Sequence, residues 1–154
     1  MSAIESRLKE LGLVLPEAST PAANYIPWTR SGTLIFISGQ IPRKDGKPAF
    51  LGKLGQNLSP EEGSDAAKTC ALSLIAHLRE ACGGDLDRVT RIVKLTGFVN
   101  SAPDFVDQPK VVNGASDLFV AVFGDKGRHA RSAIGTAALP LGVAVEVEGI
   151  FEIA

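Results

Sequence analysis

The chain has 154 residues with 16 basic and 17 acidic side chains, which gives a net charge of -1. This length predicts one domain over residues 1–154, and the charge balance argues against nucleic acid or an anionic membrane as a partner. The N-terminus lacks the basic start and apolar centre of a signal peptide, and no apolar run approaches the roughly 20 residues that cross a bilayer. We therefore expect a cytoplasmic protein that binds a small molecule.

The first predicted element is a short helix. Ser2 and Glu5 have the spacing of a capping box, and the helix is expected to end before Gly12. A connection that contains Pro16 and Pro21 follows. We expect this N-terminal helix, within residues 1–14, to dock on the rest of the domain.

Two strands are predicted next. The first is an irregular strand over residues 22–30, and the second covers residues 33–38, where the sequence LIFIS is almost entirely apolar. Such a run is typical of a strand that is covered on both faces. Gly39 directly after it indicates a place where the backbone approaches another group closely. Residues 42–58 are rich in Gly, Lys and Pro and are predicted to form a long loop.

The strongest helix signal begins at Ser59, which precedes a proline at the first helical position and a capping-box glutamate, Glu62. The helix is expected to end near Gly83. His77 falls outside its apolar stripe, so we predict a surface histidine without a functional role. The stripe consists of Ala67, Cys70, Ala71, Leu74, Ile75, Leu78 and Cys82.

The two cysteines of this helix are predicted to be buried thiols. Cys70 and Cys82 are separated by about 18 Å along a helix, far beyond the roughly 7 Å that a disulfide can bridge. A nucleophilic role is the alternative. Against it, neither cysteine has a neighbouring histidine in the sequence or a helix N-terminus that would lower its pKa.

In the second half of the chain, the sequence predicts three strands and a helix. The first strand covers residues 89–99, and a helix within residues 104–123 begins beyond Pro109 and ends at Gly124. Two further strands lie on either side of residues 139–142. The order of elements predicts an α+β fold in which helices pack on one face of a mixed sheet.

The last two strands carry charges within an otherwise apolar run. Arg131 lies in the first of them, and a period of two places Glu146 and Glu148 on one face of the second, opposite an apolar face. One interpretation is a solvated outer face with ordinary surface charges. The other is an arginine that binds an anion, with a chemically active carboxylate nearby. His129 either flanks such a site or lies in solvent at the end of a loop.

Motifs for cofactors are absent from the sequence. We find no paired metal-ligand spacing, no GxGxxG after a strand, no phosphate-binding P-loop and no GxSxG. His77 and His129 lie too far apart in the predicted structure to form a zinc site. We therefore expect neither a metal nor an organic cofactor.

Several short motifs occur together in a characteristic order. They are SGQIP at residues 38–42, FV at 98–99, DF at 104–105, ARS at 130–132, and an LP followed by VEVE at 145–148. Over residues 22–154 this pattern resembles the Rid family, also called the YjgF family, and the N-terminal helix exceeds the compact family form. The resemblance implies a fold like that of the bacillus type of chorismate mutase, and a homotrimer with active sites between subunits. It also implies an enamine/imine deaminase that detoxifies reactive imines derived from 2-aminoacrylate, giving 2-keto acids and ammonia.

The resemblance assigns roles to individual residues. Arg131 corresponds to the arginine that holds the substrate carboxylate, which a planar guanidinium does through two parallel hydrogen bonds. Glu146, fifteen residues later, corresponds to the carboxylate that activates water, and partial burial is expected to raise its pKa. Ala133 stands where many members have cysteine, which leaves its backbone N–H for substrate binding. The other substrate-binding residues are Ser38, Gly39 and Tyr25, the last contributed by a neighbouring subunit.

Residues around Tyr25 depart from the family pattern. Asn24 replaces the usual proline, and Ile26 with Pro27 replaces a polar pair, so a different substrate range is expected. One alternative is a module that binds a keto acid or amino acid without turnover, which an assay for ammonia would distinguish. Another is the family's older label of endoribonuclease. The near-neutral charge and 6% aromatic content argue against it, because they provide neither a basic groove nor a stacking platform.

Overall fold

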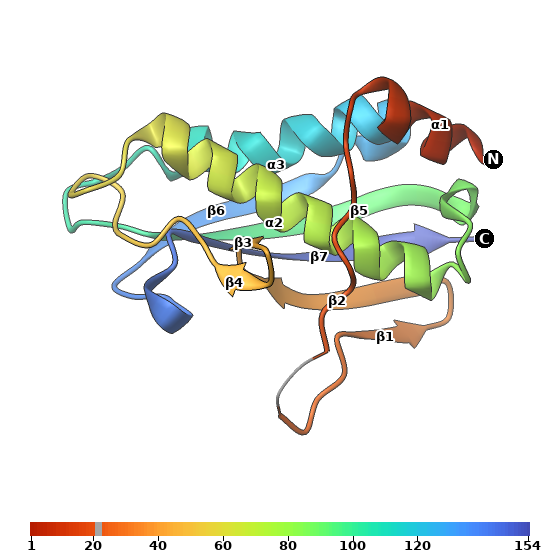
Figure 1. Ribbon diagram of the computed structural model, residues 1–154, viewed down its shortest axis with the longest axis horizontal. Helices are drawn as coiled ribbons and strands as arrows, with labels where there is room; N and C mark the ends of the chain where they lie inside the picture. The colour runs from red at the N-terminus through yellow and green to blue at the C-terminus, as the bar shows by residue number, and fades with distance from the viewer. Residues whose placement is uncertain (21–22) are drawn as a thin grey trace.

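The computed structural model describes residues 1–20 and 23–154 and shows a five-stranded sheet packed against helices (Figure 1). Residues 21 and 22, which include Pro21 and the start of the strand predicted over residues 22–30, lie outside the described residues. The α-helices are α1 (Ala3–Glu10), α2 (Pro60–Ala81) and α3 (Gln108–Phe123). The strands of the sheet are β1 (Trp28–Ser31), β2 (Leu34–Gln40), β5 (Val89–Asn100), β6 (Ala130–Thr136) and β7 (Val145–Ile153).

The sheet has the strand order β1-β2-β7-β5-β6. All neighbouring pairs are antiparallel except β5 and β6, which are parallel and are connected through α3, as a parallel pair requires. The last strand, β7, lies in the middle of the sheet between β2 and β5. Although β6 and β7 follow each other in the sequence, β5 therefore separates them in space (Figure 1).

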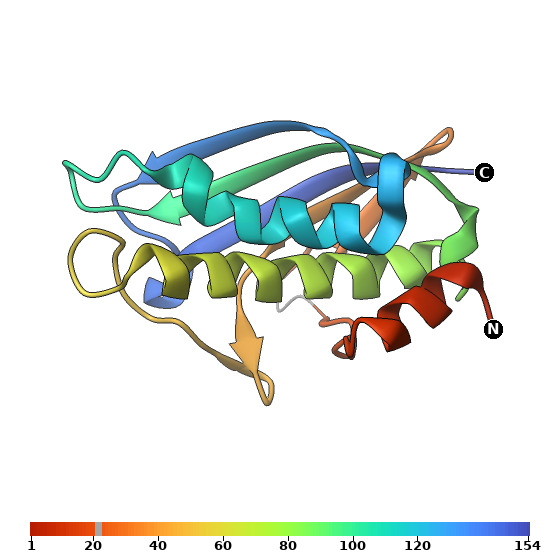
Figure 2. The ribbon, with the colours of Figure 1, turned by 90° about the horizontal axis from the view of Figure 1, so that it is seen from above.

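Helices α2 and α3 lie side by side on one face of the sheet (Figure 2). The predicted α+β fold, with a mixed sheet and helices on one face, is confirmed, and the core lies between the two layers. The alternation predicted for the last strand is also correct. Val145, Val147 and Phe151 are fully buried in the core, whereas Glu146 and Glu148 point to the opposite face. None of the described helices is long and apolar enough to cross a membrane.

The face of the sheet away from the helices is open. Ile35 and Ile37 of β2 point into the core, but Phe36 between them is 38% exposed on the open face, opposite Ile150 of β7. The expectation that LIFIS is covered on both faces is therefore wrong for a single chain, because none of the described helices packs against this face. Ile134 of β6, 47% exposed and paired with Phe98 of β5, lies on the same face, where the row of Glu148, Thr96 and Ser132 separates it from Phe36 and Ile150.

Two predicted segments need correction. The strand expected over residues 22–30 begins only at Trp28, where pairing with β2 starts. The long loop expected over residues 42–58 contains a hairpin of β3 (Arg43–Lys44) and β4 (Lys47–Pro48). Its turn, Asp45-Gly46, has positive φ at both residues, 52° and 76°, which is the Asp-Gly turn typical of two-residue hairpins.

The long helix α2 agrees with its sequence signals. Ser59 Oγ accepts a hydrogen bond from Glu62 N at 3.2 Å, and Glu62 Oε1 accepts one from Ser59 N at 3.0 Å, so the predicted capping box is present. Cys70 and Cys82 are free and buried, as predicted. Burial raises the pKa of both thiols, most strongly that of Cys70, which keeps them protonated and unreactive at neutral pH.

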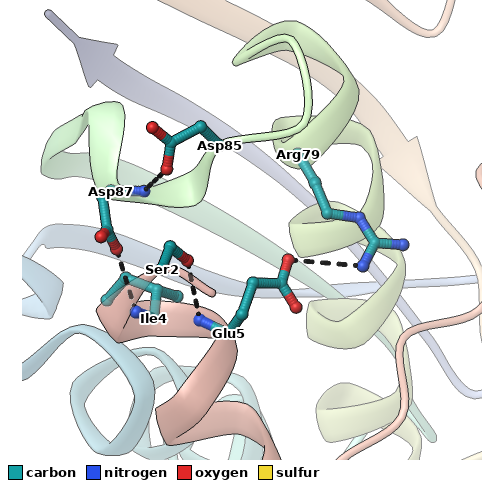
Figure 3. Close-up of polar contacts among 6 residues, drawn as sticks. All are labelled: Ser2, Ile4, Glu5, Arg79, Asp85 and Asp87. Carbon is teal, nitrogen blue, oxygen red and sulfur yellow. Dashed lines mark hydrogen bonds and ion pairs between the residues drawn. The ribbon is translucent and has the colours of Figure 1, made fainter.

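The predicted capping box of α1 is only half formed. Ser2 Oγ accepts a hydrogen bond from Glu5 N at 3.1 Å, but the Glu5 carboxylate pairs with the Arg79 guanidinium of α2 at 3.5 Å instead of returning to Ser2 (Figure 3). The Glu5 carboxylate therefore holds α1 against α2 and does not contribute to the cap of α1. Leu8 of α1 is buried in the core, so the helix docks on the domain as expected.

The turn η1 (Leu86–Arg88) holds both ends of the chain. The Asp87 carboxylate accepts hydrogen bonds from Ala3 N and Ile4 N, both at 2.9 Å, and Figure 3 shows the one from Ile4. These bonds supply partners for the first N–H groups of α1. These two bonds lower the pKa of Asp87. Arg88 donates to the backbone oxygen of Ala154 from Nε at 3.3 Å and from Nη2 at 2.8 Å.

The prediction that His77 is a surface residue is wrong. His77 is 0% exposed, because the segment of residues 13–20 runs across α2 and covers the side of the helix beyond its apolar stripe. Its Nε2 lies 3.4 Å from Ser19 Oγ of this segment, and among the described residues its Nδ1 has no hydrogen-bond partner. Burial lowers the pKa of His77, against a smaller opposite effect of Glu80.

We expect the free energy of unfolding to decrease as the pH falls below about 6.5. The folded protein keeps His77 neutral, whereas the unfolded chain takes up a proton near the ordinary histidine pKa, so acid favours unfolding by up to about 1.4 kcal/mol per pH unit for each such group. His77→Gln should reduce this pH dependence. Urea unfolding at about pH 7.5 and 5.5, at one protein concentration, measures it. An equally steep dependence in His77→Gln would contradict the assignment.

Candidate active site

Four of the residues assigned by resemblance lie around one cleft of about 510 Å³. Ser38 and Gly39 come from the end of β2, Glu146 from the start of β7, and Tyr25 from the segment before β1. The turn η3 (Pro140–Gly142) closes one side through Pro140 and Leu141. Unlike the arrangement expected from the resemblance, Tyr25 lines this cleft from the same chain as Ser38 and Glu146.

Gly39 is required by the position of Glu146. A Cβ atom at residue 39 would overlap Oε2 of Glu146, so any other residue there would displace the carboxylate. The pairing of β2 with β7 also shifts register between Ile37 and Gln40, which forms an irregularity at Ser38 and Gly39. The close approach predicted for Gly39 is therefore an approach to the carboxylate of Glu146.

The surroundings of Glu146 favour its protonated form more than water does. Burial is the larger cause and the negative charge of Glu148 the smaller one, and both raise the pKa of Glu146. None of the ion pairs in the described part of the chain involves Glu146. A half-buried carboxyl group with a raised pKa, in an open cleft, is suited to accept a proton and return it.

Arg131 does not lie in this cleft. It belongs to the edge strand β6 and is paired with Leu95 of β5, whereas Glu146 is paired with Phe98. Leu95 is buried beneath the helices, and Glu146 points to the open face, so Arg131 and Glu146 lie on opposite faces of the sheet with β5 between them. The expectation of a carboxylate near Arg131 is wrong within one chain. The two residues are close in sequence but not in space, because β6 and β7 pair with opposite edges of β5.

The guanidinium of Arg131 lies against α3. Nη1 donates to Asn113 Oδ1 at 2.8 Å and to Ser116 Oγ at 3.2 Å, and Nη2 donates to the backbone oxygen of Pro109 at 3.3 Å. All three acceptors are neutral, and none of the ion pairs among the described residues involves Arg131. Ala133 points to the same side of β6 and packs against the core. Arg131 and Ala133 thus form a second location, at the edge of the sheet.

Sequence reasoning missed several residues of both locations. Arg43 and Ser19 line the cleft, but their positions depend on how a hairpin and the N-terminal segment fold back, which no local pattern predicts. Asn113 and Ser116 had a detectable signal, because residues three apart share one face of a helix. In the described residues there is no group of three or more His, Cys, Asp or Glu side chains that could hold a metal ion.

Comparisons with known proteins agree with this fold. A family model described as "YjgF/chorismate_mutase-like, putative endoribonuclease" matches residues 5–152. The chain is 48% identical to Protein TCP17 of Trypanosoma cruzi over 97% of its own length and 94% of that protein. The structure of Atu1372 from Agrobacterium tumefaciens, a protein with unknown function, is 47% identical and has a TM-score of 0.92, with 98% of this chain and 92% of that chain covered.

A structure from Shewanella oneidensis has a TM-score of 0.93 at 37% identity, with 97% of this chain and 99% of that chain covered. The α+β sheet with helices on one face is the chorismate mutase-like fold. The chain belongs to the YjgF/Rid family.

Proposed function

We propose that this protein hydrolyses small imines that carry a carboxylate, giving 2-keto acids and ammonia, at clefts between the subunits of a homotrimer. The observation that carries the proposal is Glu146, a half-buried carboxylate with a raised pKa that lies against Gly39 in an open cleft. In the reaction Glu146 accepts a proton from water as the oxygen attacks the imine carbon. It then returns this proton to the nitrogen, which gives a carbinolamine. Finally it accepts the proton of the new hydroxyl group and passes it to the nitrogen, so that the C–N bond breaks, ammonia leaves and the C=O bond forms.

The substrate carboxylate is held by Arg131 of a neighbouring subunit. Support comes from the open face of the sheet, where a monomer would expose the large apolar side chains of Phe36 and Ile134 to water. A three-fold ring that covers this face would bring the edge strand β6 of one subunit to the cleft of the next. Arg131 and the backbone N–H of Ala133 would then complete a site that contains Tyr25, Ser38, Gly39 and Glu146 from the other chain.

The proposal is tested by supplying imine from an amino-acid oxidase or dehydratase and following keto acid and ammonia with time. We expect both products to appear faster when the protein is added, and trapping of the free imine by an amine nucleophile to decrease. If a keto acid binds but imine hydrolysis is not accelerated, the chain is a binding module instead. Degradation of RNA without imine hydrolysis would favour the endoribonuclease activity named in the family description.

Mixing two inactive variants tests the shared cleft. Arg131→Ala and Glu146→Gln subunits, each inactive alone, should regain activity when subunits exchange, because some clefts then combine an intact Arg131 with an intact Glu146. In randomly mixed trimers about one cleft in four is intact, so about a quarter of the wild-type rate is expected. No recovery after exchange, verified by mass spectrometry of the mixed trimers, would contradict a site between subunits.

Glu148→Gln should shift the pH dependence of the reaction. The negative charge of Glu148 raises the pKa of Glu146, so its removal should lower that pKa and extend the basic form of Glu146 to lower pH. The acid limb of kcat/KM against pH should therefore move to lower pH, while the plateau changes little. Because Glu148 is exposed, the fold should be retained. An acid limb that stays in place would show that another group controls it.

A further inference from the structure

A chain of hydrogen bonds connects the guanidinium of Arg131 to Ser116, His129 and the backbone of Gly127. Ser116 Oγ, which accepts from Arg131 Nη1, lies 2.9 Å from Nε2 of His129. Nδ1 of His129 lies 2.6 Å from the backbone oxygen of Gly127, in the turn η2 (Gly124–Gly127). These four groups connect the backbone of η2 to a side chain at the edge of the sheet.

The chemistry of the partners sets the direction of each bond. The carbonyl of Gly127 can only accept, so Nδ1 of His129 carries the hydrogen. In a neutral imidazole Nε2 is then an acceptor, and the hydroxyl of Ser116 must donate to it. A lone pair of Ser116 Oγ consequently faces Arg131. His129 thus determines that Ser116 presents an acceptor, and not a donor, to the guanidinium.

The His129 ring is held in place and kept neutral. It packs edge-on against Phe119 of α3, with ring centroids 6.3 Å apart and an angle of 69° between the planes. Burial and the charge of Arg131 lower the pKa of His129, against the hydrogen bond to Gly127. Other charged residues of α3 and of the η2 segment include Asp117, Asp125 and Arg128, and the last two pair with each other at 3.6 Å.

The contacts with α3 leave one edge of the guanidinium free. Both N–H bonds of Nη1 are used by Asn113 and Ser116, and one of Nη2 is used by Pro109. Among the described residues, Nε–H and the other N–H of Nη2 have no partner. Nε and Nη2 form the edge of an arginine that binds a carboxylate through two parallel bonds. The internal contacts therefore fix Arg131 on one side and leave it open for an anion on the other.

We propose that His129 and Ser116 are positioning residues, which hold Arg131 in the orientation that receives the carboxylate of the substrate. The inference rests on the proposed function of Arg131. A long arginine on an edge strand has several rotamers of similar energy, and fixing one of them before binding reduces the entropy lost when the anion binds. Without the acceptor at His129, the Ser116 hydroxyl would be free to donate to the backbone of its own helix turn.

Two substitutions of His129 separate positioning from packing. In His129→Gln, Oε1 can reach the place of Nε2 and accept from Ser116, whereas the side chain of His129→Asn reaches only the place of Nδ1. We expect His129→Asn and Ser116→Ala to raise KM for the imine, and the Kd of the keto acid, about fivefold to tenfold, with a much smaller change in kcat. His129→Gln should retain most of the affinity. Asp125→Asn, an exposed change in η2, is the matched control with no expected effect.

A second arm places His129→Asn in the Arg131→Lys background. If His129 acts through Arg131, the substitution should add little once the arginine is gone. Melting temperatures and trimer content are recorded for every variant. Wild-type affinity in His129→Asn, or equal losses in His129→Gln and His129→Asn, would overturn the proposal while imine hydrolysis by the wild type still stands. If the wild type hydrolyses no imine, the Kd of the keto acid alone decides whether His129 positions Arg131.

Discussion

Glu146→Gln is expected to lower kcat/KM for imine hydrolysis by about a hundredfold to ten-thousandfold, the usual contribution of a general acid and base. Glutamine keeps the size of the side chain and fits the same space beside Gly39, but it cannot accept a proton from water. The loss should therefore come from chemistry and not from unfolding. Kinetics in the coupled oxidase reaction measure the effect.

Binding provides the control for Glu146→Gln. A keto acid should still bind the variant, since in the proposed site its carboxylate contacts Arg131, and calorimetry should give a Kd close to that of the wild type. Turnover and binding would thus be separated. If Glu146→Gln hydrolyses imine as fast as the unmodified protein, the carboxylate is structural and the protein is better described as a binding module.

Arg131→Lys is expected to reduce kcat/KM about tenfold to a hundredfold, which corresponds to the loss of about 1.5 to 3 kcal/mol for one charged hydrogen bond. Lysine retains the charge but cannot form two parallel bonds to a carboxylate. It also cannot reproduce the three contacts that Arg131 makes with α3. Both KM and the Kd of the keto acid should increase, and the fold should be retained.

Arg43→Lys is the matched comparison. Arg43 lines the cleft in the same chain as Glu146, so it is the other arginine that could hold a carboxylate. We expect its conversion to lysine to have a much smaller effect than Arg131→Lys. The opposite ranking would transfer the carboxylate contact to Arg43 and make a site within one subunit sufficient.

Local patterns predicted the features that depend on neighbours in sequence. The alternation of β7 and the cap of α2 at Ser59 follow from residues within one strand or one turn, and both agree with the structure. The order of the strands does not follow from such patterns. Insertion of β7 between β2 and β5 places Arg131 and Glu146 on different sides of β5, although they are close in sequence.

Burial of a residue by a segment outside its own helix or strand was equally hard to predict. His77 lies away from the apolar stripe of α2, yet residues 13–20 cover it, and nothing in the helix itself indicates that cover. In contrast, the Asp45-Gly46 turn had a known sequence signature within the predicted loop. The roles of Arg131 and Glu146 were assigned from a family resemblance. The residue pattern alone could not assign them, because charged residues are also expected on any strand face that is exposed to solvent.

The turn η1 fixes both ends of the chain, which has a consequence for engineering. Asp87 binds the start of α1 and Arg88 binds Ala154, whereas Glu146 lies at the opposite end of β7, roughly 25 Å away at the usual rise of a strand. A short linker could join the two termini into a circular chain without crossing the cleft. A protein fused at either terminus would project from the end of the sheet remote from Glu146, so that the cleft would stay accessible.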